Sequence, residues 1–238
     1  SLHREAPASA EVPALQLDER RRAVVVAYAF KPHHTLARDV RAIVCRQIDR
    51  AEHELIAIGD ARSDRALHDA RRHLKKILAL LRLVKPAIAQ EYSRFSGPVR
   101  RACLMLAPLA DAEALVGTAS GQAASRHPGI DAASASAVRA ALRRQQADAD
   151  RKAAFRRVRT RAARLLALER SRVERWAAPL GGFESLAPGL ARSMRRTRRA
   201  MARADSCRRQ EAFHTWRRRV KDLWFQVRLV EGCCPHSL

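Results

Sequence analysis

The chain contains the same basic segment twice. Residues 66–84 (ALHDARRHLKKILALLRLV) align without a gap with residues 212–230 (AFHTWRRRVKDLWFQVRLV), and eight of the nineteen positions are identical. Self-similarity of this kind reports a repeated architecture and limits the folds that the chain can adopt. Most of the identical positions carry a cation or a histidine, which core packing alone does not require. The identical pairs are Ala66/Ala212, His68/His214, Arg71/Arg217, Arg72/Arg218, Lys75/Lys221, Arg82/Arg228, Leu83/Leu229 and Val84/Val230.

Both copies have the period of an amphipathic helix. At about 100° per residue, the apolar side chains of each copy share one face and the basic side chains form a stripe beside it. The apolar faces are Leu67, Leu74, Ile77, Leu78 and Leu81 in the first copy, and Phe213, Val220, Leu223, Trp224 and Val227 in the second. The stripes are His68, Arg71, Lys75 and Arg82, and His214, Arg217, Lys221 and Arg228.

The stripes differ from an ordinary solvated helix face. Such a face normally mixes signs, with Asp or Glu four residues from Lys or Arg. These stripes hold no carboxylate, because Asp69 and Asp222 lie off them. A purely solvating role remains open, but the repetition favours a surface that binds an anion.

Composition points to the same kind of partner. The chain has 238 residues, with 47 Lys and Arg against 24 Asp and Glu, for a formal charge of +23. Such a charge implies a polyanionic partner: nucleic acid, an anionic membrane or inorganic polyphosphate. Aromatic residues make up only 5% of the chain, which disfavours binding of single strands by base stacking. Abundant Ala and Leu predict a nearly all-helical protein.

The five cysteines do not form a metal-ligand pattern. No CxxC pair and no Cys/His ligand spacing occurs, so we expect no metal site and no cofactor. The odd number of cysteines fits a reducing cytoplasm. No segment is apolar over the length of a membrane span, and we expect no membrane partner.

The positions of Gly and Pro, which commonly end helices, predict the order of the elements. Residues 1–30 are expected to form a tail or linker, and residues 31–238 a helical domain with halves at about 31–120 and 134–238. The Gly-, Ala- and Ser-rich residues 117–136 are the predicted linker between the halves. The predicted helices are 35–58 with Thr35 as N-cap, 64–85, an apolar segment 87–116 broken at Gly97–Pro98, one long helix 136–176, 186–204 and the second repeat.

The helix before the second repeat is also basic on one side. Its uncharged positions Leu190, Met194, Thr197 and Met201 lie opposite a row of arginines. Two faces of one sign will not pack against each other, because close like charges repel. We therefore expect the two helices to line a shared groove or pore. The row is Arg192, Arg196, Arg199 and Arg203, with Arg195 adjoining it, and the candidate binding residues among them are Arg192, Arg195, Arg196 and Arg199.

At these residues the sequence resembles the conserved histidine α-helical domain family, called CHAD. The resemblance rests on His68-Asp-Ala-Arg71-Arg72 with Lys75 and Lys76, and on His214-Thr-Trp-Arg217-Arg218 with Lys221. It implies an all-α fold of two pseudo-symmetric antiparallel helical bundles with a basic groove or pore between them. The second bundle would be incomplete at the C-terminus, so either the chain is truncated there or another chain supplies the missing helices. A second copy of the chain is therefore among the expected partners.

The resemblance also implies a function. We expect non-enzymatic binding of inorganic polyphosphate, or of another phosphate or sulfate polyanion, at polyphosphate granules in the bacterial cytoplasm. A helical nucleic-acid-binding protein is the second choice, and a polyphosphate-processing enzyme the third. For the two histidines, ligand contact, a structural role and catalysis all stay open. The expected binding residues are His68, Arg71, Arg72, Lys75, Lys76, Arg82, Arg192, Arg195, Arg196, Arg199, His214, Arg217, Arg218, Lys221 and Arg228, and no catalytic residue is expected.

Overall fold

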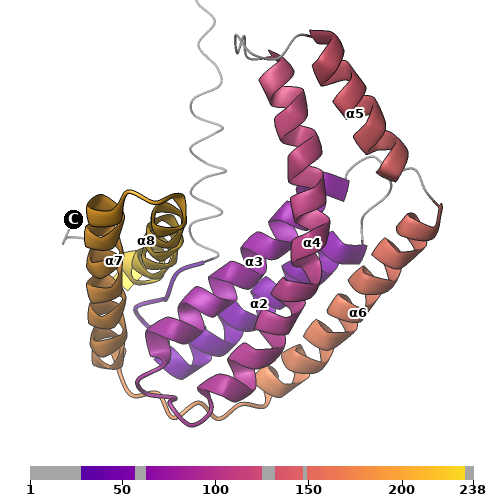
Figure 1. Cartoon of the computed structure of the whole chain (residues 1–238). Helices are drawn as coiled ribbons and strands as arrows, with labels where there is room; N and C mark the ends of the chain where they lie inside the picture. The colour runs from indigo at the N-terminus through magenta and orange to yellow at the C-terminus, as the bar shows by residue number, and fades with distance from the viewer. Residues whose placement is uncertain (1–27, 57–62, 125–131, 147–148, 234–238) are drawn as a thin grey trace, which may run out of the picture.

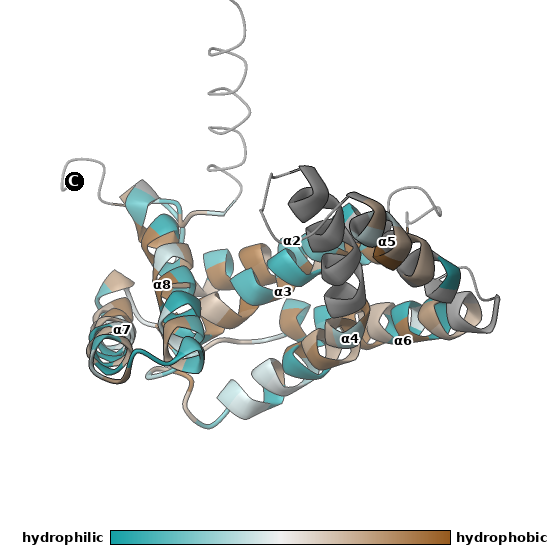
Figure 2. Cartoon of the chain, turned by 45° about the horizontal axis from the view of Figure 1, so that its top comes forward, coloured by the Kyte–Doolittle hydropathy of each residue, from teal (hydrophilic) through white to brown (hydrophobic). Residues whose placement is uncertain are grey.

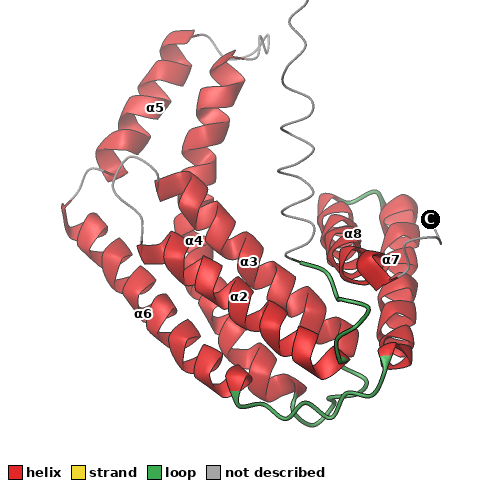
Figure 3. Ribbon diagram, turned by 180° about the vertical axis from the view of Figure 1, so that it is seen from behind, coloured by secondary structure: helices red, strands yellow, loops and turns green. Residues whose placement is uncertain are grey.

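The protein is all-α. The computed structural model describes residues 28–56, 63–124, 132–146 and 149–233, and these ranges contain seven α-helices, two short 3-10 helices and no strand (Figures 1 and 3). The predicted fold class is confirmed at this level. The helices are α2 (Leu36–Ile56), α3 (Ser63–Val84), α4 (Tyr92–Ala124), α5 (Ala132–Gln146), α6 (Ala149–Glu174), α7 (Ala187–Cys207) and α8 (Gln210–Val230), with η1 (Phe183–Leu186) and η2 (Glu231–Cys233).

Several helix boundaries follow the sequence signals. The amide N–H of Arg38 donates to the Thr35 hydroxyl at 3.4 Å, so Thr35 caps α2 as predicted. The helix α3 covers the whole first copy of the repeat and ends two residues before Pro86, and α8 covers the whole second copy. Both predicted repeat helices are confirmed.

The predicted break at Gly97–Pro98 is wrong. The helix α4 continues through it and also contains Pro108. Proline inside a helix removes one backbone hydrogen bond and is disfavoured. Phe95, Val99 and Ala102 follow helical spacing and are all buried, so burial of this face outweighs the local preference.

The prediction of a single helix over residues 136–176 is also wrong. That stretch is divided between α5, which packs on α4, and α6, which packs on α2 and α4. No Gly or Pro marks the division, so tertiary packing rather than local propensity decides it. Residues 117–124 belong to α4 and residues 132–136 to α5, and helix therefore covers much of the predicted linker.

Four helices enclose the main core. The helix α3 packs on α2 and α4, and α6 contacts both α2 and α4 (Figure 1). Val40, Ile43 and Ile48 of α2 meet a run of buried residues in α3 that is nearly continuous from Leu74 to Val84. Since neighbours surround α3, its C-terminal half is buried on almost every side.

The helices α7 and α8 form a hairpin beside this group. Arg208, in the turn between them, takes the left-handed conformation with φ of 46°. The start of α7 touches α3 closely, because a Cβ atom at Gly189 would lie 1.7 Å from the carbonyl oxygen of Leu83. Only glycine permits this approach. Met194 and Met201 of α7 are exposed, and Figure 2 shows hydrophobic residues on the hairpin.

The segment before α2 packs under α8. Tyr28 and Phe30 are buried, and the Tyr28 ring meets Phe225 edge-on with centroids 6.1 Å apart. The amide of Phe30 donates to the carbonyl oxygen of Leu229 at 2.9 Å. Residues 28–30 of the expected tail thus join the core, while residues 1–27 lie outside the described residues. The division of the domain into two halves stays a prediction.

Candidate anion-binding site

The two repeated helices cross near their C-terminal halves. Arg82 of α3 donates through Nη1 to Oδ1 of Asp222 in α8 at 2.8 Å. The Gln226 side chain donates through Nε2 to the carbonyl oxygen of Ala79 at 3.1 Å. These polar contacts fix the register of the crossing.

The crossing brings one pair of repeat positions close together twice. In the second pair, each position is supplied by the other copy of the repeat. In the alignment Arg82 corresponds to Arg228, and Asp222 corresponds to Lys76. Arg82 contacts Asp222, and Arg228 lies close enough to Lys76 to lower the pKa of its ammonium group. One pair is attractive and the other repulsive, although the positions correspond.

A basic pocket lies where α3, α4, α7 and α8 meet. Its volume is about 230 Å³, and six cations face a single carboxylate in its lining. The lining residues are Arg82, Lys85, Tyr92, Arg100, Arg192, Ser193, Arg196, Thr197, Arg219 and Asp222. Of the residues expected from the sequence, the pocket brings together Arg82, Arg192 and Arg196.

The single carboxylate is already engaged. Asp222 bonds to Arg82, and its other oxygen lies 3.9 Å from Nη1 of Arg219. Burial raises the pKa of Asp222, and the neighbouring guanidiniums of Arg82 and Arg219 only partly offset this effect. The positive charge in the pocket therefore greatly exceeds what Asp222 can neutralise.

Tyr92 contacts two cations of the pocket, Lys85 and Arg100, that were not predicted from the sequence. The Lys85 ammonium lies 4.6 Å from the centroid of the Tyr92 ring, and Arg100 donates through Nη2 to the Tyr92 hydroxyl at 2.7 Å. Lys85 lies one turn beyond Arg82, so extending the basic stripe would have found it. With a break expected at Gly97–Pro98, the position of Arg100 could not be predicted. The continuous α4 places Arg100 in the lining of the pocket. Arg219 lies off the predicted stripe of α8.

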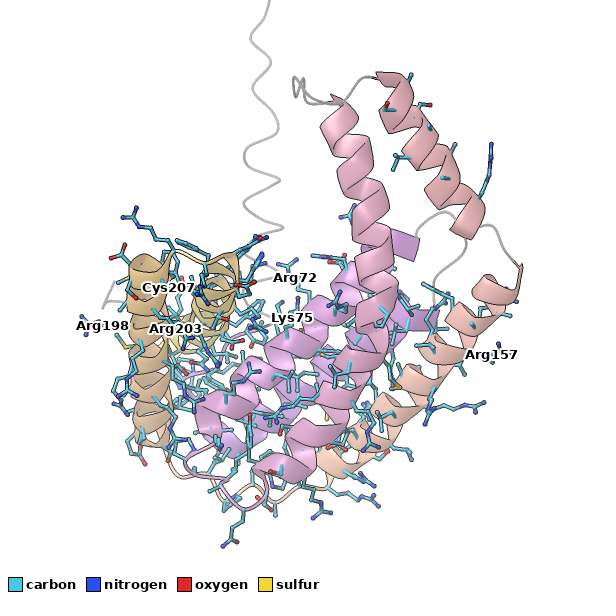
Figure 4. All side chains as sticks on the ribbon, in the orientation of Figure 1. Arg72, Lys75, Arg157, Arg198, Arg203 and Cys207 are labelled. Atoms are coloured by element: carbon cyan, nitrogen blue, oxygen red, sulfur yellow. The ribbon has the colours of Figure 1, made fainter. Side chains whose placement is uncertain are left out.

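The first basic stripe runs along the α4 side of α3. Burial raises the pKa of the Cys103 thiol in α4 to about 11, and the charges of Arg71, Lys75 and Arg82 act against that shift. All three cations therefore lie near the same point of α4. His68, one turn before Arg71, is exposed. Figure 4 shows Lys75 between the α7–α8 hairpin and α4 in that view.

Other expected residues lie elsewhere. Arg72 and Lys76 line a separate recess between α2 and α3. Arg195 and Arg199 are exposed on α7 and do not line the basic pocket. Arg218 donates to the Thr215 hydroxyl at 3.2 Å, and Arg228 pairs with Glu231 at 3.2 Å.

The second basic stripe does not enter the basic pocket. His214, Arg217 and Lys221 are exposed, and the His214 ring lies 3.3 Å from the amide nitrogen of the Gln210 side chain. At about 100° per residue, all three project at least 80° around the α8 axis from both Arg219 and Asp222. The basic pocket therefore does not contain both stripes, and a groove that joins them stays a prediction.

Fold and site together define a class of basic, all-helical repeat domains. The sequence profile of the CHAD domain matches residues 42–238, which is more than half of the chain. The chain belongs to the CHAD domain family, as the sequence analysis expected. Comparisons with curated proteins and with solved structures find no match.

Two further properties of the described residues bear on partners. None of their helices is both long and apolar enough to cross a membrane. No group of three or more His, Cys, Asp or Glu side chains among the described residues is arranged to hold a metal ion.

Proposed function

We propose that this protein binds inorganic polyphosphate and does not process it. The observation that carries the proposal is the basic pocket, in which six cations share one engaged carboxylate beside the crossing of the repeats. A site of this kind is electrostatically incomplete without an anion. Attachment to cytoplasmic polyphosphate granules is part of the proposal.

The chemistry of the lining suits a chain of phosphates. Arginine donates two parallel hydrogen bonds to phosphate oxygens, and lysine adds a point charge. Arg82, Lys85 and Arg100 come from α3 and α4, whereas Arg192, Arg196 and Arg219 come from α7 and α8. Cations on both sides would hold a phosphate thread from opposite directions.

The basic stripes of α3 and α8 would guide the chain toward this pocket. His68, Arg71, Lys75 and Arg82 extend along α3 over roughly 20 Å at 1.5 Å per residue. The exposed stripe of α8 offers a second basic surface. The ion pair of Arg82 with Asp222, and the electrostatic effect of Arg228 on Lys76 at the corresponding positions, support a pseudo-symmetric pair of bundles with a groove between them.

A helical nucleic-acid binder is the second candidate, because the net charge of +23 would attract DNA or RNA as well. The basic pocket favours polyphosphate over bases. Its one aromatic ring, Tyr92, has Lys85 and Arg100 beside it and is only 6% exposed, so little of the ring is open to stacking with a base. A polyphosphate-processing enzyme ranks third.

The decisive test is the double variant Arg192→Glu/Arg196→Glu. We expect it to lose about a hundredfold or more of its affinity for labelled polyphosphate, because two bidentate donors become repulsive charges in the pocket. The slope of log affinity against log salt should also become shallower. Binding is measured by fluorescence anisotropy at fixed salt.

The matched control is Arg157→Glu/Arg198→Glu, which changes the net charge equally. Both side chains are exposed and point outward on opposite sides of the molecule (Figure 4). We expect this control to stay within about threefold of the wild type, because exposed distant charges are screened. Equal losses in both variants would reject the pocket. Preference for duplex DNA at matched salt would favour the second candidate, and shortening of the polyphosphate with Mg²⁺ or Mn²⁺ the third.

A further inference from the structure

A second basic recess lies on the other side of α3, away from the basic pocket. It is an open hollow of about 480 Å³ between α2 and α3. Its cations are Arg46, Arg50, Arg72 and Lys76, of which the sequence analysis had assigned the last two to the polyphosphate site. The lining residues are Arg46, Asp49, Arg50, His53, Glu54, Asp69, Arg72, His73 and Lys76.

The carboxylates of this recess are only partly available to its cations. Asp49 bonds to Arg170 of α6 at 2.5 Å, and Asp69 lies 3.9 Å from Arg65. Among the described residues, none of the four cations of the recess makes an ion pair with a carboxylate. The four cations exceed the three carboxylates Asp49, Glu54 and Asp69 by one, so the recess keeps a formal excess of one positive charge, counting Lys and Arg against Asp and Glu.

Lys76 is the buried member of this cluster. It is only 5% exposed, and its Nζ lies 4.9 Å from the centroid of the Tyr28 ring. Burial, followed by repulsion from Arg72, Arg50 and Arg228, lowers the pKa of Lys76 to about 8, with only Asp69 acting in the opposite direction. The neighbouring His73 adds no charge near neutral pH, because burial and the charge of Lys76 lower its pKa to about 4.

The repeat shows what is missing beside Lys76. At the corresponding position of the second copy, the carboxylate of Asp222 neutralises Arg82. The corresponding pair with the copies exchanged is Lys76 and Arg228, which are both cations, and the charge of Arg228 lowers the pKa of Lys76. Arg228 has Glu231 at 3.2 Å, but Lys76 has no such partner among the described residues. An oxyanion from solution would supply the negative charge that Asp222 supplies in the other copy.

We propose that this recess binds a single phosphate or sulfate group, as a site separate from the basic pocket. Arg72 and Lys76 would be its principal donors. Asp69 and Glu54 line the same recess and would repel an extended polyanion, which limits the ligand to one tetrahedral oxyanion. The site does not depend on the proposed polyphosphate pocket.

Sulfate is the best probe, because its charge does not change between pH 6 and pH 10. We expect a saturable shift of backbone amide signals from residues 72–76 when sulfate replaces chloride at constant ionic strength. Affinity should fall about tenfold between pH 7 and pH 9, because Lys76 loses its proton around pH 8. Absence of saturable shifts in α2 and α3 would overturn the proposal.

Lys76→Gln and Arg72→Gln should each weaken sulfate binding about tenfold, and Lys76→Gln should also abolish its pH dependence. Arg72 is exposed, so its variant tests the site without disturbing the core. Arg157→Gln, on α6, is the matched control. Unchanged sulfate binding in both Lys76→Gln and Arg72→Gln would overturn the proposal.

The variant Arg192→Glu/Arg196→Glu separates this site from the basic pocket. Sulfate should still shift residues 72–76 in that variant, whether or not polyphosphate binding has been lost. Simultaneous loss of both would show that the recess is not a separate site. Adding orthophosphate or tripolyphosphate to the same variant then identifies the source: free phosphate, or the end of a longer chain.

Discussion

The two copies of the repeated helix share cations but not surroundings. Leu67, Leu74 and Leu78 of α3 are 0%, 0% and 6% exposed, whereas the corresponding Phe213, Val220 and Trp224 of α8 are 43%, 42% and 50% exposed. The reason is coverage: α3 packs against α2, α4, α7 and α8, but α8 packs chiefly against α7 and α3. A repeated sequence thus gives a repeated helix, while the neighbours decide which copy builds a core.

The largest expected difference between the copies is in stability. Leu74→Ala should lower the free energy of unfolding by about 2–5 kcal/mol, because it leaves a cavity in a fully buried site. Val220→Ala, at the corresponding position, should cost less than about 1 kcal/mol because the side chain is already partly in solvent. Urea unfolding followed by circular dichroism measures both. Equal costs would mean that α8 is covered as well as α3.

The contact between α7 and α3 gives the next largest effect. Gly189→Ala should destabilise the protein by about 1–3 kcal/mol, because the added methyl group meets the Leu83 carbonyl. Gly97→Ala in α4 is the control: nothing lies within 4 Å of its Cβ position, and alanine should gain about 0.5–1 kcal/mol there. Calorimetric melting temperatures should therefore move in opposite directions. Equal responses would contradict the close approach of α7.

Removal of the charge at position 76 or at position 222 should change the free energy of unfolding by a smaller amount, with opposite signs in the two copies. Lys76→Met should stabilise the protein by about 1–2 kcal/mol at pH 7, because a buried unpaired cation is removed. Asp222→Ala should destabilise it by about 1 kcal/mol, because Arg82 loses the acceptor of its 2.8 Å hydrogen bond. Destabilisation by both variants would contradict the comparison.

The pH dependence sharpens this contrast. The pKa of Lys76 falls from 10.5 to about 8 on folding, so between these values the unfolded chain binds more protons than the folded one. Stability should consequently rise as pH increases from 8 to 10.5. Thermal melts across this range should show the rise in the wild type and its loss in Lys76→Met.

The smallest effect on stability concerns the two histidines. His68 and His214 are exposed, so each change to alanine should alter the free energy of unfolding by less than about 0.5 kcal/mol. If they contact polyphosphate, each variant should lose a few-fold in affinity in the same binding assay, and the double variant more. Loss of stability instead would support the structural role.

The sequence predicted what depends on local pattern. The repeat helices, the Thr35 cap and the family followed from periodicity and motif, as did Arg82, Arg192 and Arg196 of the basic pocket. Lys85, Tyr92 and Arg100 were missed because α3 and α4 must pack before they converge. The separation of Arg72 and Lys76 from that pocket depends on where α2 and α8 lie, which no helical spacing in α3 reveals.

The buried residues Tyr28 and Phe30 carry a practical consequence for anyone preparing this domain. The family match begins at residue 42. The last turns of α8 nevertheless contact residues before it, through the Tyr28–Phe225 ring contact and the Phe30–Leu229 hydrogen bond. A fragment that begins at residue 42 would lack the Tyr28 ring that packs against Phe225, and apolar surface of α8 would be exposed to solvent. Domain boundaries for expression should therefore be placed ahead of residue 28.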